Sequence, residues 1–397
     1  MGARELGNPL GNPVGLAKVE AGAPLSAVGS IRISESPPAV GEWAALNWSP
    51  WDERVFAAAG LTGDIERKSK LPDPAVVPDS DGYGCAWGGV YLAVVYRISA
   101  PYVTIYKRDG DTLTKLAGPA VAPTGNGAGC AFSPDGNYLA VAHAISPYVT
   151  IYKREGDTFT KLANPATLPT GDGAGCAFSP DGNYLAVAHA SSPAITIYKR
   201  DGDTFTKLAN SPTLGGSGSA CSFSPDGLYL SVGISVSPYI IVYKRDGDTL
   251  TKLANPATLP TGAINGCSMS GTHLAAGQGS SPYLSIYRRS GDALTFVGSA
   301  NLVGNVIDCR FSPCGRYLAV AGLSAPYLAI VKFDGDNFLK LADPAVLPPS
   351  YARGCAFTVD GGFLAVAHHI APRVTVYRGS TPNLPAVAPK VARVRVA

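Results

Sequence analysis

One sequence unit occurs seven times in this chain, and a cysteine marks the same place in every copy. Successive marker cysteines lie 42 to 46 residues apart and account for seven of the eight cysteines: Cys85, Cys130, Cys176, Cys221, Cys267, Cys309 and Cys355. Repetition at this period indicates an architecture in which each copy is one supersecondary unit that buries its faces against its neighbours. A single copy is therefore not expected to fold alone.

Each copy has the pattern of four short β-strands. In the copy that starts at Cys176, an apolar segment ends in a Ser-Pro-Asp-Gly turn, and a second apolar segment covers 184–189. Residues 195–200 alternate between apolar and polar, which is the period of a β-strand. An Asp-Gly turn then leads to a fourth segment at 204–208. Four-stranded units without helical segments predict an all-β fold, a single β-propeller of four-stranded antiparallel blades.

The number of complete copies favours seven blades, and eight blades are the alternative. A degenerate copy, "LNWSPWDERVFAAAG", precedes the seven at 46–60. With seven blades, a strand near residues 65–71 completes the last blade; with eight, the degenerate copy forms a reduced N-terminal blade. The predicted domains are an N-terminal extension or anchoring arm at 1–60, which contains the degenerate copy, the β-propeller at 61–380 and a C-terminal tail at 381–397.

The repeat is similar to that of a known group of proteins. The segments "FSPDGNYLAVA" and "IYKREGDTFTKLANPATLP" resemble the WD-repeat-like propeller arrays found in bacterial and bacteriophage structural proteins. The resemblance covers about 73–378, although the Gly-His and Trp-Asp pairs of WD repeats are missing. It implies a propeller and, as an expectation, a role as a virion component such as a tail, fibre or capsid-surface protein.

Charge and hydropathy narrow the expected partners and location. The net charge is +3, and no long run of Lys or Arg occurs, so nucleic acid is not expected as a partner. The start of the chain has no apolar segment of signal-peptide length, and no stretch of about 18 apolar residues follows. We therefore expect no membrane insertion, and a protein of a virion or of a cytoplasmic assembly.

The repeated cysteines and histidines are interpreted as structural residues. Equivalent residues of adjacent blades should be about 10 Å apart, beyond the roughly 7 Å that a disulfide allows, so the marker cysteines are expected to fill the core. His143, His189 and His368 end the second strand of their copies and are expected to form hydrogen bonds there, whereas His273 and His369 are predicted at the surface. Cys314 replaces the Asp of a turn and is predicted as an exposed thiol. No metal, cofactor or catalytic set of residues is predicted.

Departures from the repeat are the candidates for binding. They concentrate in the loops between copies and in the loops after the second strand, which share one face of a propeller. An aromatic and arginine mixture on such a face is typical of a binding surface, although loop drift alone produces some of it. The predicted binding residues are Asp79, Asp81, Tyr83, Tyr96, Arg97, Gln278, Asn305, Asp308, Tyr351 and Arg353.

These observations favour a non-enzymatic binding or structural propeller over an enzyme. The expected role is protein–protein attachment or recognition of a host surface, because the copies are nearly identical and lack a unique catalytic set. Expected partners are other structural proteins of a larger assembly, bound through residues 1–60, and a host-surface protein or glycan. The alternatives are a lactonase-type propeller enzyme and an intracellular scaffold.

Overall fold

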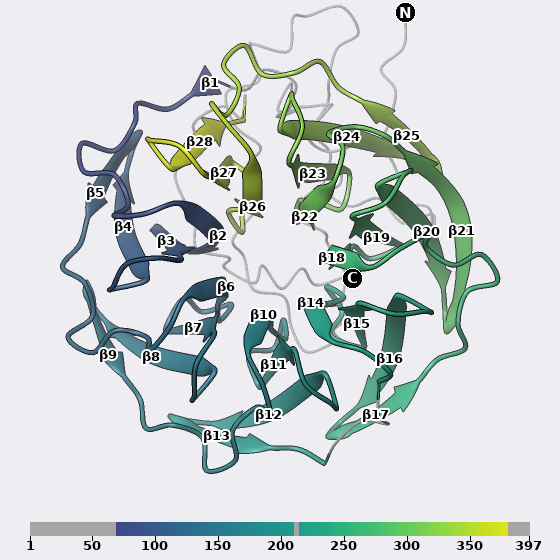
Figure 1. Cartoon of the computed structure of the whole chain (residues 1–397), viewed down its shortest axis with the longest axis horizontal. Coiled ribbons are helices and arrows are strands. Elements are labelled where there is room, and N and C mark those ends of the chain that lie inside the picture. Colours follow the sequence, from purple (N-terminus) through teal and green to yellow (C-terminus); the bar gives the residue numbers. More distant parts are fainter. Residues whose placement is uncertain (1–68, 210–213, 380–397) are drawn as a thin grey trace, which may run out of the picture. The chain divides into compact units, whose positions relative to one another are not determined.

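The chain forms a closed ring of seven blades around a central channel (Figure 1). The computed structural model describes residues 69–209 and 214–379, and each blade in this part is a four-stranded antiparallel sheet. These residues contain no helix, and none could therefore cross a membrane as a helix. The predicted all-β propeller with seven blades is confirmed, whereas the degenerate copy and the proposed limits at 60/61 and 380/381 lie outside the described residues.

The strands of every blade run in sequence order from the channel to the rim, except that the outermost strand of blade 7 comes from the beginning of the described chain. Blade 1 consists of β2 (Gly82–Gly88), β3 (Tyr91–Tyr96), β4 (Val103–Asp109) and β5 (Thr112–Lys115), blade 2 of β6 (Gly127–Phe132), β7 (Tyr138–His143), β8 (Val149–Glu155) and β9 (Thr158–Lys161), and blade 3 of β10 (Gly173–Phe178), β11 (Tyr184–His189), β12 (Ile195–Asp201) and β13 (Thr204–Lys207). Blade 4 consists of β14 (Gly218–Phe223), β15 (Tyr229–Ile234), β16 (Ile240–Asp246) and β17 (Thr249–Lys252), and blade 5 of β18 (Ile264–Met269), β19 (His273–Gln278), β20 (Leu284–Ser290) and β21 (Ala293–Ala300). Blade 6 consists of β22 (Val306–Phe311), β23 (Tyr317–Gly322), β24 (Leu328–Asp334) and β25 (Asn337–Lys340), and blade 7 of β26 (Ala352–Phe357), β27 (Phe363–His368), β28 (Val374–Arg378) and β1 (Ser69–Lys70).

The ring is closed by two segments from opposite ends of the described chain. Ser69 pairs with Arg378 and Lys70 with Tyr377, and the N–H of Leu71 adds a hydrogen bond to a carbonyl of β28 at 2.8 Å. Strand β1 thus completes blade 7 within the segment predicted to do so, of which residues 65–68 lie outside the described residues. The N–H of Gly379 donates to a carbonyl in the β26–β27 turn, so the described chain also ends at that side of the ring.

The core lies between neighbouring blades. The second strand of each blade is buried on both sides, since it is covered by the blades before and after it. The marker cysteines fill the same space: all seven are buried and free, and the Sγ of Cys176 lies 3.6 Å from the carbonyl oxygen of Ala140 in the preceding blade. Burial raises the pKa of the Cys176 thiol to about 12, as expected for a thiol enclosed by apolar side chains.

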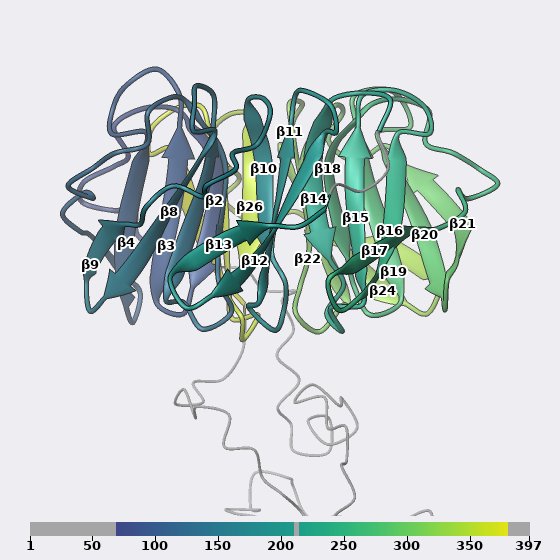
Figure 2. The same ribbon diagram turned by 90° about the horizontal axis from the view of Figure 1, so that it is seen from below.

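The ring has two different faces, seen edge-on in Figure 2. The loop face carries the connections between the second and third strands and between successive blades. The turn face carries the short turns within each blade, such as those between β2 and β3 and between β4 and β5.

On the turn face, a recurring trio of polar residues joins neighbouring blades at the five junctions from blade 1 to blade 6. In blade 2 the hydroxyl of Tyr138 donates to Oδ1 of Asp203 in blade 3 at 2.6 Å, and the Nζ of Lys153 lies 2.8 Å from Oδ2. The bridging carboxylate directly follows the Asp-Gly turn of its blade, so the turn also positions a bridge between blades. Equivalent trios are Tyr91–Lys107–Asp157, Tyr184–Lys199–Asp248, Tyr229–Lys244–Asp292 and His273–Arg288–Asp336.

Two predictions for this face are wrong. His273 is buried rather than at the surface, because it takes the place of the bridging tyrosine and lies 3.2 Å from Oδ1 of Asp336. Cys314 is half-buried rather than exposed, because its turn folds back so that Sγ lies 3.2 Å from Oγ of Ser312 and the side chain packs against the core between blades 6 and 7.

Candidate functional site

Small residues line most of the channel. The inner strands approach one another closely, and a Cβ on Gly266 would lie 2.6 Å from the Cα of Asp308 in the next blade. Glycine is therefore required where two inner strands are nearly in contact. The remaining space is a cavity of about 230 Å³ that opens among Tyr83, Arg97 and Arg353.

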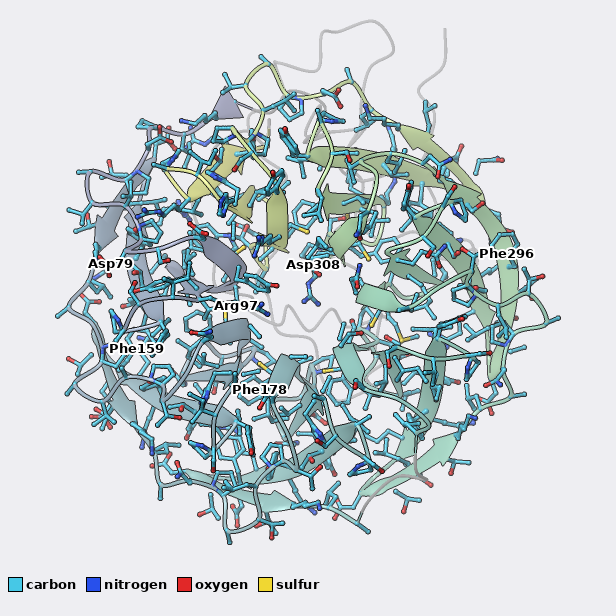
Figure 3. The ribbon with its side chains drawn as sticks, viewed as in Figure 1. Asp79, Arg97, Phe159, Phe178, Phe296 and Asp308 are labelled. Carbon is cyan, nitrogen blue, oxygen red and sulfur yellow. The ribbon has the colours of Figure 1, made fainter. Side chains whose placement is uncertain are left out.

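Blade 6 departs from this lining and places a charged pair in the channel wall. The third and fifth residues of β22 are Asp308 and Arg310, where the equivalent strand of blade 7 has Gly354 and Ala356. Figure 3 shows Asp308 beside the open centre of the ring. The Nε of Arg310 lies 3.4 Å from Oδ1 of Asp308, and about a third of the arginine side chain remains accessible from the channel.

The carboxylate of Asp308 is held by backbone groups of two blades. Its Oδ1 accepts a hydrogen bond from the N–H of Cys309 at 2.9 Å, and its Oδ2 accepts one from the N–H of Cys355 at 3.1 Å. Burial raises the pKa of Asp308, and Arg310 and the two N–H groups oppose that shift. Asp308 in turn raises the pKa of Arg310, which remains a cation. The guanidinium of Arg310 is therefore accessible from the cavity, whereas the carboxylate of Asp308 is occupied by hydrogen bonds to the backbone of the channel wall.

At the mouth of the cavity, two arginines lie over one tyrosine ring. The guanidinium carbon of Arg97 is 3.6 Å from the ring centre of Tyr83, and that of Arg353 is 4.6 Å from it. Arg97 follows β3, Tyr83 lies on β2 and Arg353 lies on β26, so the cluster joins blades 1 and 7. Figure 3 shows Arg97 at the channel side of blade 1. Neither arginine forms an ion pair with a carboxylate among the described residues.

An aromatic group from blades 6 and 7 lies next to this cluster. The ring of Tyr351 stacks on His369 with centres 5.8 Å apart, and Tyr327 meets Tyr351 edge-on at 6.1 Å. The Nδ1 of His369 lies 2.5 Å from Oδ2 of Asp81, which holds the imidazole in place. Tyr351 itself is exposed.

The structure thus brings five of the predicted binding residues together near the mouth and places Asp308 in the channel wall below them. The five are Asp81, Tyr83, Arg97, Tyr351 and Arg353.

The other four predicted residues have structural partners elsewhere. Asp79 lies over blade 1 and pairs with Lys115 of β5 at 3.0 Å (Figure 3). Tyr96 is buried and donates to Asp79 at 3.0 Å, and Asn305 accepts a hydrogen bond from Asn265 at 3.0 Å. Gln278 is fully buried at the end of β19 and donates to Thr261. Tyr96 and Gln278 are therefore not surface residues, because the end of the second strand is covered by neighbouring blades.

The histidines of the second strand occupy the same buried column as Gln278. The Nε2 atoms of His143, His189 and His368 each lie 2.9 Å from the hydroxyl of a threonine on the adjacent strand, so the three rings remain in separate blades. Burial lowers the pKa of all three, for His368 to about 4. Among the described residues, no group of three or more His, Cys, Asp or Glu side chains is placed to hold a metal ion.

Arg310 was not among the residues predicted from the sequence, although the sequence contains a signal for it. Arg310 departs from the repeat inside an inner strand rather than in a loop. The residues at this position in blades 1, 2, 3 and 7 are Ala86, Ala131, Ala177 and Ala356. A comparison of every column of the repeat would have found Arg310 beside Asp308, which was already among the predicted residues.

The fold and channel define the protein class as a seven-bladed β-propeller. The family model described as "Lactonase, 7-bladed beta-propeller" matches residues 94–264, which is less than half of the chain. A chain of the solved structure titled "Crystal Structure of Mitotic Checkpoint Complex" superimposes with a TM-score of 0.59 at 17% identity, covering 78% of this chain and 93% of that chain. That likeness concerns the fold alone. No curated protein matches the sequence.

Proposed function

We propose that this chain is a non-enzymatic binding propeller whose loop face holds an anionic group of its partner at the channel mouth. The observation that carries the proposal is the placement of Arg97 and Arg353 over the ring of Tyr83, at the opening of a cavity, without a carboxylate partner among the described residues. Guanidinium groups with free N–H donors recognise carboxylates and phosphates through paired, charge-assisted hydrogen bonds.

The charges of the cavity support the same conclusion. Its lining includes the cations Arg97, Arg310 and Arg353 but the single acid Asp308, which leaves a net positive charge. Because water is limited in a narrow channel, an anion there interacts more strongly with these cations than it would at an open surface.

The state of the titratable groups favours binding over catalysis. Both oxygens of Asp308 accept backbone hydrogen bonds, and this carboxylate is therefore poorly placed to accept a proton from a substrate. His143 and His189 are buried and bonded to threonines of their own blades, out of reach of a ligand at the mouth.

Binding is tested by calorimetric titration with citrate and with inorganic phosphate at low ionic strength. We expect Arg97→Gln with Arg353→Gln to lower the affinity for citrate at least about tenfold, since two charge-assisted contacts are lost. Arg288→Gln is the matched control, because Arg288 is an exposed arginine of the turn face. Equal affinities of the wild type and the double variant would overturn the proposal.

We further propose that the propeller belongs to a larger particle, a phage or prophage virion component with residues 1–60 as its anchoring arm. The support is the resemblance of the repeat to phage structural arrays. The described chain begins and ends at the turn face, which would leave the channel mouth on the opposite face available to a partner. Deletion of residues 1–60 should leave a folded propeller that no longer enters the particle, and retained incorporation contradicts this role.

The second candidate is a lactonase-type enzyme, which the family-model match over 94–264 favours. It is tested by assaying the purified chain against a panel of lactones. Hydrolysis that is lost in His143→Ala with His189→Ala, while the variant stays folded, would replace the binding proposal.

A further inference from the structure

The loop face is apolar on one side of the channel only. Seven exposed large apolar side chains lie on the loops of blades 7, 1 and 2 or on the connections that lead into these blades. Among the described residues, the loops of the other four blades expose only Val236 in this way. The seven residues, which we call the apolar arc, are Val76, Ile98, Val121, Ile145, Val346, Tyr351 and Ile370.

The repeat itself does not require these apolar residues. Where blade 2 has Ile145, blades 3, 5 and 6 have serine, and where the connection into blade 2 has Val121, two other connections have threonine: Ser191, Ser280, Ser324, Thr167 and Thr258. The backbone architecture is therefore maintained with small polar residues at these positions. Exposed apolar side chains gathered on one sector are instead typical of an interaction surface.

The cations at the mouth border the same sector. Arg97 belongs to blade 1 and Arg353 to blade 7, and Arg97 is adjacent in sequence to Ile98 of the apolar arc. Among the described residues, no acidic side chain of this sector forms an ion pair with either arginine, and these acids have other partners. The pairs are Lys70–Asp73 at 2.5 Å, Lys115–Asp79 at 3.0 Å and His369–Asp81 at 2.5 Å.

We propose that the apolar arc and the two arginines together form the docking site of a protein partner, which supplies a segment with acidic and apolar side chains. Its carboxylates bind Arg97 and Arg353, and its apolar side chains cover the arc. This inference rests on the proposed function, since it assigns the bound anion to a carboxylate of a polypeptide. Two cations beside aliphatic side chains suit such a segment better than nucleic acid, which requires many phosphate contacts.

The test is a selection of displayed random 12-residue peptides on the full-length chain. We expect enrichment of peptides that combine Asp or Glu with large apolar residues. Ile98→Ser with Ile370→Ser, and separately Arg97→Gln with Arg353→Gln, should each weaken a selected peptide at least about tenfold. Val236→Ser is the matched control, because it removes an exposed apolar side chain on the other side of the loop face. Circular dichroism of each variant checks that the ring is folded.

The outcomes separate this inference from the proposed function. The docking site is overturned if citrate binding depends on the arginines but no peptides are enriched. It is also overturned if the selected peptides bind the variants of the apolar arc as tightly as the wild type. Either result leaves the proposed anion site supported. Enrichment of basic or uncharged peptides also overturns the docking site. If the wild type binds neither citrate nor any displayed peptide, both proposals are overturned.

Discussion

The hydroxyl of Tyr184 on β11 donates a hydrogen bond of 2.5 Å to Oδ1 of Asp248, which lies in the next blade. The same carboxylate pairs with Lys199 at 2.7 Å, and these two contacts hold the pKa of Asp248 below its ordinary value. Because equivalent trios recur around the turn face, the ring is fastened at its surface as well as packed in its core.

Removing the hydroxyl in Tyr184→Phe should weaken this fastening without opening the core. We expect the Tm to fall by about 1 to 3 °C, because Asp248 is exposed and water replaces part of the lost contact. The pKa of Asp248 is lower in the folded state than its ordinary value of 3.8, so its charged form stabilises the folded protein fully above about pH 3.8. The effect of the substitution should therefore shrink as the pH falls below about 3.8 and the carboxylate becomes protonated. A Tm difference that stays constant from pH 7 to pH 3 would contradict the role of Asp248.

The buried histidines should make the propeller sensitive to mild acid. The pKa of His368 falls from 6.5 to about 4, so its neutral form stabilises the folded state fully above pH 6.5 and less as the pH drops toward 4. The shift corresponds to roughly 3 kcal/mol over this range. Urea unfolding of His368→Gln should therefore show a smaller loss of stability between pH 6.5 and pH 4.

Blade 5 provides the control for the histidine experiment, since Gln278 already occupies the same column. The reverse change, Gln278→His, should add a loss of stability over the same pH range. Identical pH profiles for the wild type and both variants would show that this column does not titrate.

Removing only the arginine of the charged pair in the channel wall should lower the stability of the ring. Arg310→Ala leaves the carboxylate of Asp308 without its cation, and we expect a loss of about 1 to 3 kcal/mol at pH 7. The loss should be smaller at pH 4, because a raised carboxylate pKa favours the protonated folded state as the pH falls.

The matched variant replaces both residues with those of blade 7. Asp308→Gly with Arg310→Ala reproduces Gly354 and Ala356 and should be more stable than Arg310→Ala alone. Additive losses in a double-mutant cycle, measured by urea unfolding, would mean that the two side chains act independently.

Thiol labelling should separate Cys314 from the seven marker cysteines. Cys314 is half-buried at a turn, whereas the others are enclosed between blades, and burial raises the pKa of Cys85 and Cys176 to about 12. A disulfide reagent should therefore label one thiol of the native chain, with the remainder slower by roughly a hundredfold or more. Cys314→Ser should abolish the fast phase, and a persistent fast phase would place a marker cysteine in an accessible position.

The sequence repeat determines most of this fold, and its length of 42 to 46 residues can be read from the sequence alone. The spacing of the marker cysteines predicted the blades, and the alternation in segments such as 195–200 predicted the strands, because a buried strand in a repeat has few alternatives. Side-chain exposure at strand ends was less predictable. Tyr96 and Gln278 lie next to polar loops in sequence, yet neighbouring blades cover them.

The site was predicted in part for a similar reason. Tyr83, Arg97 and Arg353 stand out as departures from the repeat, but their meeting depends on the ring bringing blade 7 next to blade 1. That contact joins residues about 270 positions apart in the chain. His273 was placed wrongly because its role comes from a bridge to Asp336 in the next blade, which no local pattern indicates.

The short pairing of β1 with β28 also sets how the ring would respond to mechanical load. Ser69 and Arg378 are antiparallel partners at the two ends of the described chain, so a pull applied to both ends acts on their hydrogen bonds one after another rather than on all of them at once. Peeling of this kind requires little force, whereas the hydrogen bonds of the other blades would be loaded only after blade 7 has opened. Under tension applied at both ends of the described chain, blade 7 should therefore unfold first, before the other six blades.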